Sequence, residues 1–102
     1  MRRAAKVDRN QAEIVEALRA VGATVQTLHT VGQGVPDLLV GYQRQTHLLE
    51  VKALEGKRAP KAAAKTIDQI AWHHSWRGRA VAVVSTVNEA LIAIGAHCVD
   101  PY

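Results

Sequence analysis

The sequence has few of the features that mark secreted or membrane proteins. Its 102 residues include one cysteine, so Cys98 has no partner for a disulfide within the chain. The N-terminal stretch MRRAAKVDRNQ has no apolar run of the kind found in signal peptides. No apolar stretch approaches the roughly 20 residues that cross a bilayer. These absences predict a cytoplasmic protein that does not enter a membrane.

The chain is also too short for two independent cores, so we expect a single domain over residues 1–102. A domain of this size buries roughly 65% of the surface that its unfolded chain exposes. An interface between two copies would therefore add useful stability. The length favours a homodimer.

Acidic residues are outnumbered, with 9 Asp and Glu against 13 Lys and Arg and a net charge of +4. Eight of the basic residues form two groups: Arg2, Arg3, Lys6 and Arg9, then Lys57, Arg58, Lys61 and Lys65. Clusters of this kind suit contacts with the phosphates of DNA, although a modest positive charge also serves solubility. We interpret residues 1–7 as a basic tail and residues 54–65 as a mobile basic loop.

The apolar pattern predicts the order helix, three strands, helix, strand, helix. The predicted helices cover residues 8–22, 66–78 and 86–95, and the predicted strands cover 23–30, 37–42, 46–53 and 80–86. The last strand is apolar on both faces, which indicates a central strand covered on both sides and parallel to the strand before the helix. The fold class is therefore α/β.

The predicted helix at 66–78 carries an apolar face formed by Ile67, Ile70, Ala71 and His74. Thr66 and Gln69 have the spacing of a capping box at its start. Trp72 and Trp76 lie one turn apart. They could stack on unpaired bases, but a helix that lies on a sheet normally buries such residues, so we expect packing.

The residues that carry chemistry are GVPD at 34–37 and EVK at 50–52. Side chains alternate along a strand, so Glu50 and Lys52 share one face. Pro36 fixes the chain as it enters the preceding strand, which lets Asp37 stand beside Glu50 across the hairpin. Two carboxylates then converge with one lysine.

Two carboxylates this close repel each other unless a cation lies between them, and their hard oxygen ligands suit Mg²⁺ or Mn²⁺. Such an ion can polarise a phosphodiester while a lysine neutralises developing charge. The alternative is an ordinary ion pair of Glu50 and Lys52 on an exposed strand, with Asp37 as a turn residue. The combination of all three residues favours the metal site.

GVPD, a hairpin, EVK and then a helix with Gln69 and Trp72 resemble the PD-(D/E)XK nuclease superfamily, and above all its VRR-NUC branch of small stand-alone phage and bacterial proteins. The resemblance covers roughly residues 8 to 94. It implies a restriction-endonuclease-like core, α-β-β-β-α-β(-α), with a four-stranded mixed sheet flanked by helices. It also implies that Asp37, Glu50 and the backbone carbonyl of Val51 bind the metal and that Lys52 is the catalytic lysine.

Two further residues are candidates through the same resemblance. Glu13 could supply the acidic residue that the first helix often contributes, yet it lies away from the apolar stripe of that helix, as a solvated residue would. Asn10 and Gln11 are alternative polar neighbours of the site. Gln69 resembles a glutamine that follows the ExK strand in many relatives, although capping also explains it.

The sequence thus predicts a structure-selective or junction-resolving DNA endonuclease that acts as a homodimer. The alternative is a non-catalytic nucleic-acid-binding module that uses a nuclease fold. The set of Asp37, Glu50 and Lys52 favours the endonuclease, because a binding module has no use for paired acids that repel phosphate. A restriction-like enzyme that reads a base sequence is less favoured, because 102 residues leave little room for a recognition domain.

Overall fold

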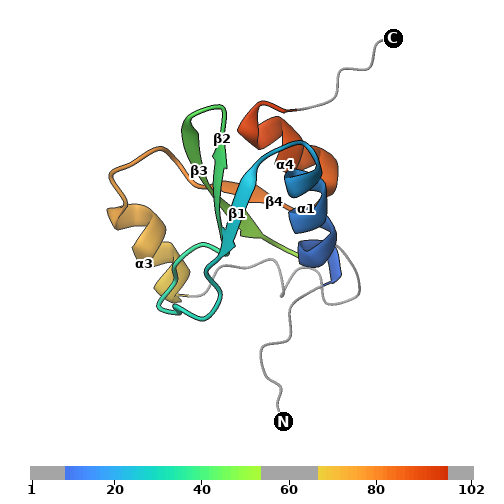
Figure 1. The fold of residues 1–102 in the computed structure, drawn as a ribbon. Helices are drawn as coiled ribbons and strands as arrows, with labels where there is room; N and C mark the ends of the chain where they lie inside the picture. The colour runs from blue at the N-terminus through green and yellow to red at the C-terminus, as the bar shows by residue number, and fades with distance from the viewer. Residues whose placement is uncertain (1–8, 54–66, 97–102) are drawn as a thin grey trace.

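A computed structural model describes residues 9–53 and 67–96, and its elements follow the predicted order (Figure 1). The helices are α1 (Arg9–Ala20), α3 (Ile67–Ser75) and α4 (Val87–Ile94). The strands are β1 (Thr24–Thr27), β2 (Leu38–Tyr42), β3 (Gln45–Val51) and β4 (Ala82–Val84). The basic residues expected to contact DNA in the tail and in the loop lie outside the described residues, as does Thr66.

The four strands form one mixed sheet in the order β1-β2-β3-β4. β2 runs antiparallel to both β1 and β3, whereas β4 runs parallel to β3, as the helical crossover predicts. The prediction that residues 80–86 form a central strand covered on both faces is wrong. β4 lies at an edge of the sheet, and Val83 keeps 48% of its surface exposed because it points away from the face that α1 and α4 cover.

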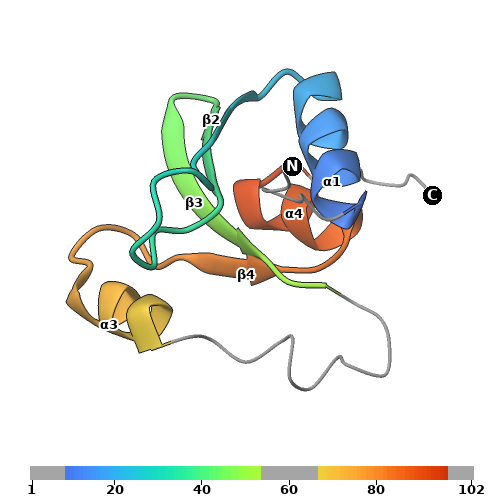
Figure 2. The same cartoon turned by 90° about the horizontal axis from the view of Figure 1, so that it is seen from below.

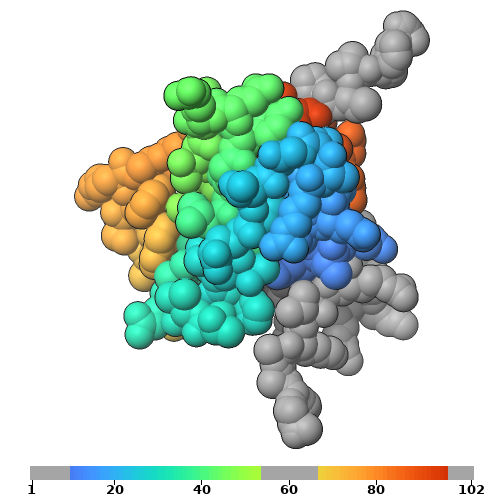
Figure 3. All heavy atoms as spheres, viewed as in Figure 1, coloured from blue at the N-terminus to red at the C-terminus, as the bar shows by residue number. Residues whose placement is uncertain are grey.

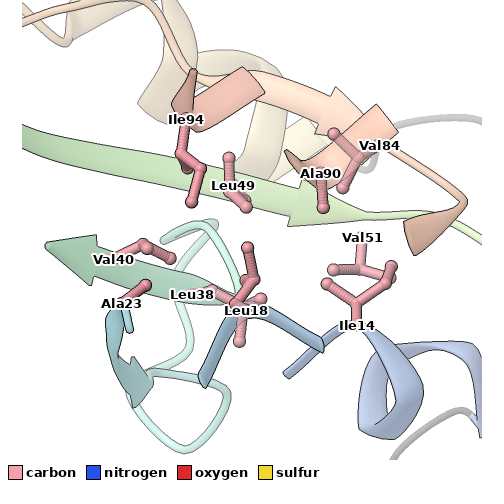
Figure 4. Close-up of a cluster of buried hydrophobic side chains, with 10 residues drawn as sticks. All are labelled: Ile14, Leu18, Ala23, Leu38, Val40, Leu49, Val51, Val84, Ala90 and Ile94. Carbon is pink, nitrogen blue, oxygen red and sulfur yellow. The ribbon is translucent and has the colours of Figure 1, made fainter. Parts of the chain in front are cut away.

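The hydrophobic core lies on one face of the sheet, where α1 and α4 pack together (Figure 2). Alternate residues of β2 and β3 point into it, as the period of a strand requires. The core consists of Ile14, Leu18, Ala23, Leu38, Val40, Leu49, Val51, Val84, Ala90 and Ile94 (Figure 4). In the first helix, Ile14 and Leu18 are fully buried in this core, whereas Val21 at the end of the same apolar stripe is 39% exposed.

β2 and β3 are joined by a tight turn of two residues, Gln43 and Arg44, between the paired residues Tyr42 and Gln45. Both turn residues have positive φ, at 51° and 66°. This conformation matches the twist of the two strands, and it is the one usually taken by Asn-Gly. The hairpin is shorter in its loop than the predicted QRQ.

Ile67, Ile70, Ala71 and His74 share one face of α3, as predicted, and this face points to solvent. Ile67 is 83% exposed and Ile70 is 54% exposed, and no residue of α3 is buried. The opposite side of the helix faces the sheet and carries Gln69, Trp72 and His73, which are half-buried. The rotation has a physical reason, because the amide of Gln69 bonds to polar groups of β3 and the chain around it.

The packing of α3 is correspondingly sparse. In Figure 3 the helix lies at the margin of the molecule, beyond the green atoms of the β2–β3 hairpin. The sheet therefore has a well-covered face and a face that α3 covers only in part. Within the described ranges, none of the helices is long and apolar enough to span a bilayer.

Candidate active site

Asp37 and Glu50 meet where β2 begins and β3 ends. Leu38 pairs with Leu49, so the next position of the register sets Asp37 opposite Glu50. The backbone carbonyl of Asp37 accepts a hydrogen bond from the N–H of Leu28 at 2.8 Å. Its carboxylate oxygen Oδ2 accepts one from the N–H of Val51, also at 2.8 Å. Both neighbouring segments thus fix Asp37 in place.

Glu50 is a buried carboxyl group. Only 2% of its surface is exposed, and burial together with the nearby charge of Asp37 raises its pKa from 4.5 to about 7. The charge of Lys52 and the hydrogen bond from Gln69 oppose that rise. Its oxygen Oε1 is buried and accepts no hydrogen bond from the described residues. A buried acceptor of this kind needs a partner.

Lys52 and Gln69 form the polar wall beside Glu50. The Nζ of Lys52 lies 3.7 Å from Oε2 of Glu50 and donates a hydrogen bond to Oε1 of Gln69 at 3.2 Å. The Nε2 of Gln69 donates a short hydrogen bond to the same Oε2 of Glu50. The three side chains therefore form a closed ring of contacts, and Gln69 is the residue that joins α3 to the site.

The backbone N–H of Val51 also points toward Asp37. In a strand, the N–H and the C=O of one residue point to the same side. The N–H of Val51 donates to Asp37, so its carbonyl oxygen also points toward the edge at which Asp37 lies. The carbonyl that the family resemblance implies as a metal ligand thus points to the side of β3 on which Asp37 lies.

The first helix reaches this end of the sheet through Asn10. Its Nδ2 donates to the carbonyl oxygens of Lys52 at 3.0 Å and of Ser85 at 3.2 Å. One amide thereby joins α1 to the ends of both parallel strands. Glu13 is exposed, in agreement with its place on the helical wheel, and Gln11 is buried. A catalytic role for Glu13 stays a prediction.

The donor set fits a hard divalent cation that keeps several of its waters. Among the described residues there is no cluster of three or more His, Cys, Asp or Glu side chains, so a cage made entirely of side chains is absent from that part of the chain. Two carboxylates and a backbone carbonyl are a typical set for Mg²⁺ or Mn²⁺. A cation would supply the partner for Oε1 of Glu50 and would offset the repulsion from Asp37.

The role of Gly34, the first residue of GVPD, is not apparent from the sequence. Its φ of 84° favours glycine, and a Cβ at this position would collide with the backbone carbonyl of Asp68 and lie 2.9 Å from the N of Gln69. The first turn of α3 therefore crosses directly over Gly34. The only signal in the sequence was a glycine two residues before Pro36, and it does not reveal which segment crosses there.

A four-stranded mixed sheet with helices on both faces, and with two acids and a lysine where β2 begins and β3 ends, defines an α/β fold of the restriction-endonuclease type. Neither a known family's sequence profile nor a curated protein matches this chain. A solved structure described as "VRR_NUC domain" does, with a TM-score of 0.58 and 31% sequence identity, over 82% of this chain and 90% of that one. The chain belongs to the VRR-NUC branch of the PD-(D/E)XK nuclease superfamily.

Proposed function

We propose that the protein is a metal-dependent endonuclease that hydrolyses phosphodiester bonds in DNA. The observation that carries the proposal is Glu50, a carboxyl group that is buried opposite Asp37 with one oxygen lacking a hydrogen-bond donor among the described residues. Such an arrangement raises the free energy of the folded protein without a cation. A ligand site explains why the chain holds it.

Each residue of the site has a separate role in the proposed hydrolysis. Asp37, Glu50 and the carbonyl of Val51 would hold Mg²⁺ or Mn²⁺, which would polarise the phosphodiester and lower the pKa of an attacking water. Lys52 places its ammonium group 3.7 Å from Glu50, where it can orient that water or neutralise charge on the phosphate. Gln69 holds both Lys52 and Glu50 and so fixes their relative positions.

Changing either acid tests this proposal. Asp37→Asn and Glu50→Gln should each lower metal-dependent cleavage by about 10³-fold or more, because one of two carboxylate ligands loses its charge. The assay is a panel of branched and linear DNAs with Mg²⁺, Mn²⁺ or a chelator. DNA binding and the circular dichroism spectrum should be retained. Cleavage at the wild-type rate by purified variants would falsify the proposal, and binding without any cleavage by the wild type would favour the non-catalytic binding module.

We further propose selectivity for branched DNA and action as a homodimer, so that two sites address two strands. The exposed apolar side chains of Ile67 and Ile70 on the outer side of α3 support a contact between copies. Sedimentation at micromolar concentration should give twice the 11.1 kDa mass of the chain. Ile67→Lys with Ile70→Lys should shift it to monomer, whereas Val31→Lys, an exposed residue in the β1–β2 loop, should not. A monomeric wild type with undiminished junction cleavage would contradict the dimer.

The basic loop is proposed to bind the DNA backbone. Changing Lys57, Arg58 and Lys61 together to Ala should reduce the slope of log affinity against log salt by about 2 to 3, since each phosphate contact releases counterions. Lys65 and the N-terminal Arg2 and Arg3 are the remaining candidates. If the triple variant keeps the wild-type slope, the tail rather than the loop supplies the phosphate contacts.

A further inference from the structure

The side of α3 that faces the active site continues past Gln69 as an aromatic surface. At about 100° per residue, Gln69, Trp72 and Trp76 lie within about 60° of one another around the helix axis. Gln69 touches Glu50 and Lys52. Trp76 follows the last residue of α3, and its backbone N–H donates to the backbone carbonyl of Trp72 at 3.0 Å. The helical hydrogen-bond pattern therefore extends to Trp76.

The two indoles are stacked on each other, with ring centroids 4.8 Å apart and planes inclined by 16°. Packing under the sheet, which the sequence predicts for both, is only partial: Trp72 is half-buried on the side of α3 that faces the sheet, and Trp76 is 40% exposed. The Nε1 of Trp76 donates to the carbonyl of Arg79 at 2.9 Å, which fixes the indole in its orientation. A rigid aromatic surface is thus exposed beside the site.

The charge around this aromatic pair is positive. Arg77 and Arg79 follow it and are exposed, and His74 is exposed one turn before the end of the segment. The only acidic residue of α3, Asp68, lies at the other end of the helix. Exposed aromatic rings flanked by cations are the usual surface for an unpaired nucleic-acid strand, because bases stack on the rings and phosphates contact the cations.

We propose that Trp72 and Trp76 form a stacking site for an unpaired base of the DNA strand that leaves the active site. The inference rests on the proposed nuclease function and deepens it, because it gives a reason for selectivity toward branched or frayed DNA. Trp76 lies seven positions after Gln69, which at 1.5 Å per residue is a rise of about 10 Å. This is roughly the length of three nucleotides of a stacked strand.

A DNA strand fits this surface better than a second copy of the chain. A symmetric contact between copies would place the same surface, with Arg77 and Arg79, against itself, and like charges would repel. A polyanion is attracted by the same charges. The exposed isoleucines of α3 lie on the other side of the helix and remain available for contact between copies.

Intrinsic fluorescence tests the proposal, because Trp72 and Trp76 are the only tryptophans in the sequence. The wild-type protein, in chelator so that no cleavage occurs, is titrated with a duplex, a duplex with a five-nucleotide thymidine arm, and the same arm without bases. Stacking should quench the fluorescence with the thymidine arm and much less with the abasic arm or the duplex. The abasic arm keeps every phosphate and so controls for charge.

Substitutions separate stacking from simple loss of an apolar side chain. By anisotropy, Trp76→Ala should weaken binding of the thymidine-arm DNA about tenfold, and Trp76→Phe should weaken it less. Ile92→Ala, at an exposed isoleucine of α4 that has no part in either proposed surface, is the control and should have little effect. Circular dichroism checks that α3 remains folded.

Three results would overturn the inference. These are equal quenching by abasic and thymidine arms, equal weakening of all three DNAs by Trp76→Ala, and fluorescence that changes with protein concentration but not with DNA. None of them affects the proposed nuclease function, which is tested by cleavage with the Asp37 and Glu50 variants. If the protein binds no DNA of any form, both proposals fail.

Discussion

The helices α3 and α4 are both preceded by a Thr that lies three residues before a Gln or Glu, the spacing of a capping box. The Gln and the Glu at this spacing make different contacts. In α4, Oγ1 of Thr86 accepts from the N–H of Glu89, and the carboxylate of Glu89 accepts from the N–H of Ser85. This is a variant of the capping box, because Glu89 reaches the N–H of the residue before the N-cap Thr86 rather than that of Thr86 itself. In α3 the residue with the same spacing is Gln69, and its amide reaches Glu50 and Lys52 instead.

Burial separates the two helices in the same way. α4 buries Ala90 and Ile94 in the core, whereas α3 buries no side chain. The stability of a helix in a protein comes mainly from packing of its apolar face. α4 therefore belongs to the hydrophobic framework, whereas α3 is held by polar contacts with residues of the candidate active site. Four predictions test this division, beginning with the largest expected effect.

Matched isoleucines in the two helices should differ strongly. Ile94→Ala removes a side chain that is 5% exposed and should lower the free energy of unfolding by about 2–5 kcal/mol. Ile70→Ala removes one that is 54% exposed and, in protein dilute enough to be monomeric, should change it by about 0.5 kcal/mol or less. Urea denaturation measures both. Equal losses would show that α3 is packed as firmly as α4.

The buried carboxyl group should make the metal-free protein less stable as pH rises. The folded protein keeps the proton of Glu50 up to about pH 7, whereas an unfolded chain loses it near 4.5. The free energy of unfolding should therefore fall between these pH values, by at most about 3 kcal/mol, and then level off.

Glu50→Gln removes this titration while keeping the shape of the side chain, so the variant should be more stable than the wild type at pH 8 in chelator. Chemical denaturation of both proteins at pH 4.5, 6 and 8 gives the comparison. A wild type whose stability rises with pH relative to the variant would contradict the raised pKa.

Gly34 and Gly32 provide a second matched pair. Both have positive φ, so Gly34→Ala and Gly32→Ala should each cost about 1–2 kcal/mol of stability from backbone strain. Only at Gly34 does the added methyl group meet α3, since nothing lies within 4 Å of a Cβ at Gly32. Gly34→Ala should therefore also lower kcat for DNA cleavage about tenfold by displacing Gln69. Equal kcat values for the two variants would contradict this role of Gly34.

The smallest effects on stability should come from the two cap-spaced residues. Glu89→Ala should cost about 0.5–1 kcal/mol and leave cleavage unchanged, because it removes one half of a helix cap. Gln69→Ala should have the opposite profile, with lower kcat and little change in thermal stability. Thermal melts measure the stability of both variants, and cleavage rates measure their kcat. A Gln69 variant that loses stability but keeps its kcat would assign this residue to the cap alone.

The order of the elements and the meeting of Asp37 with Glu50 could be predicted from the sequence, because both follow from local periodicity and from the register of one hairpin. The orientation of α3 could not. Its apolar stripe suggested burial, yet the contacts of Gln69 with a buried carboxyl group and its lysine turn that stripe outward.

The position of residues 80–86 in the sheet was also beyond the sequence pattern. A strand that is apolar on both faces is typical of a sheet centre, but β4 lies at an edge and leaves Val83 exposed. Period-two patterns report which face a residue occupies and not how many strands lie beside it. The contact between Gly34 and α3 is another long-range feature that no local pattern encodes.

The hairpin turn of Gln43 and Arg44 is a position at which substitution can stabilise the protein for directed evolution. Each residue adopts a left-handed conformation, which costs a residue with a side chain about 1 kcal/mol. Asn-Gly in the same turn would recover part of that energy. The turn lies at the opposite end of β3 from Glu50, roughly 20 Å along the strand. A scaffold strengthened there could tolerate destabilising substitutions around Asp37 and Glu50 while leaving their geometry untouched.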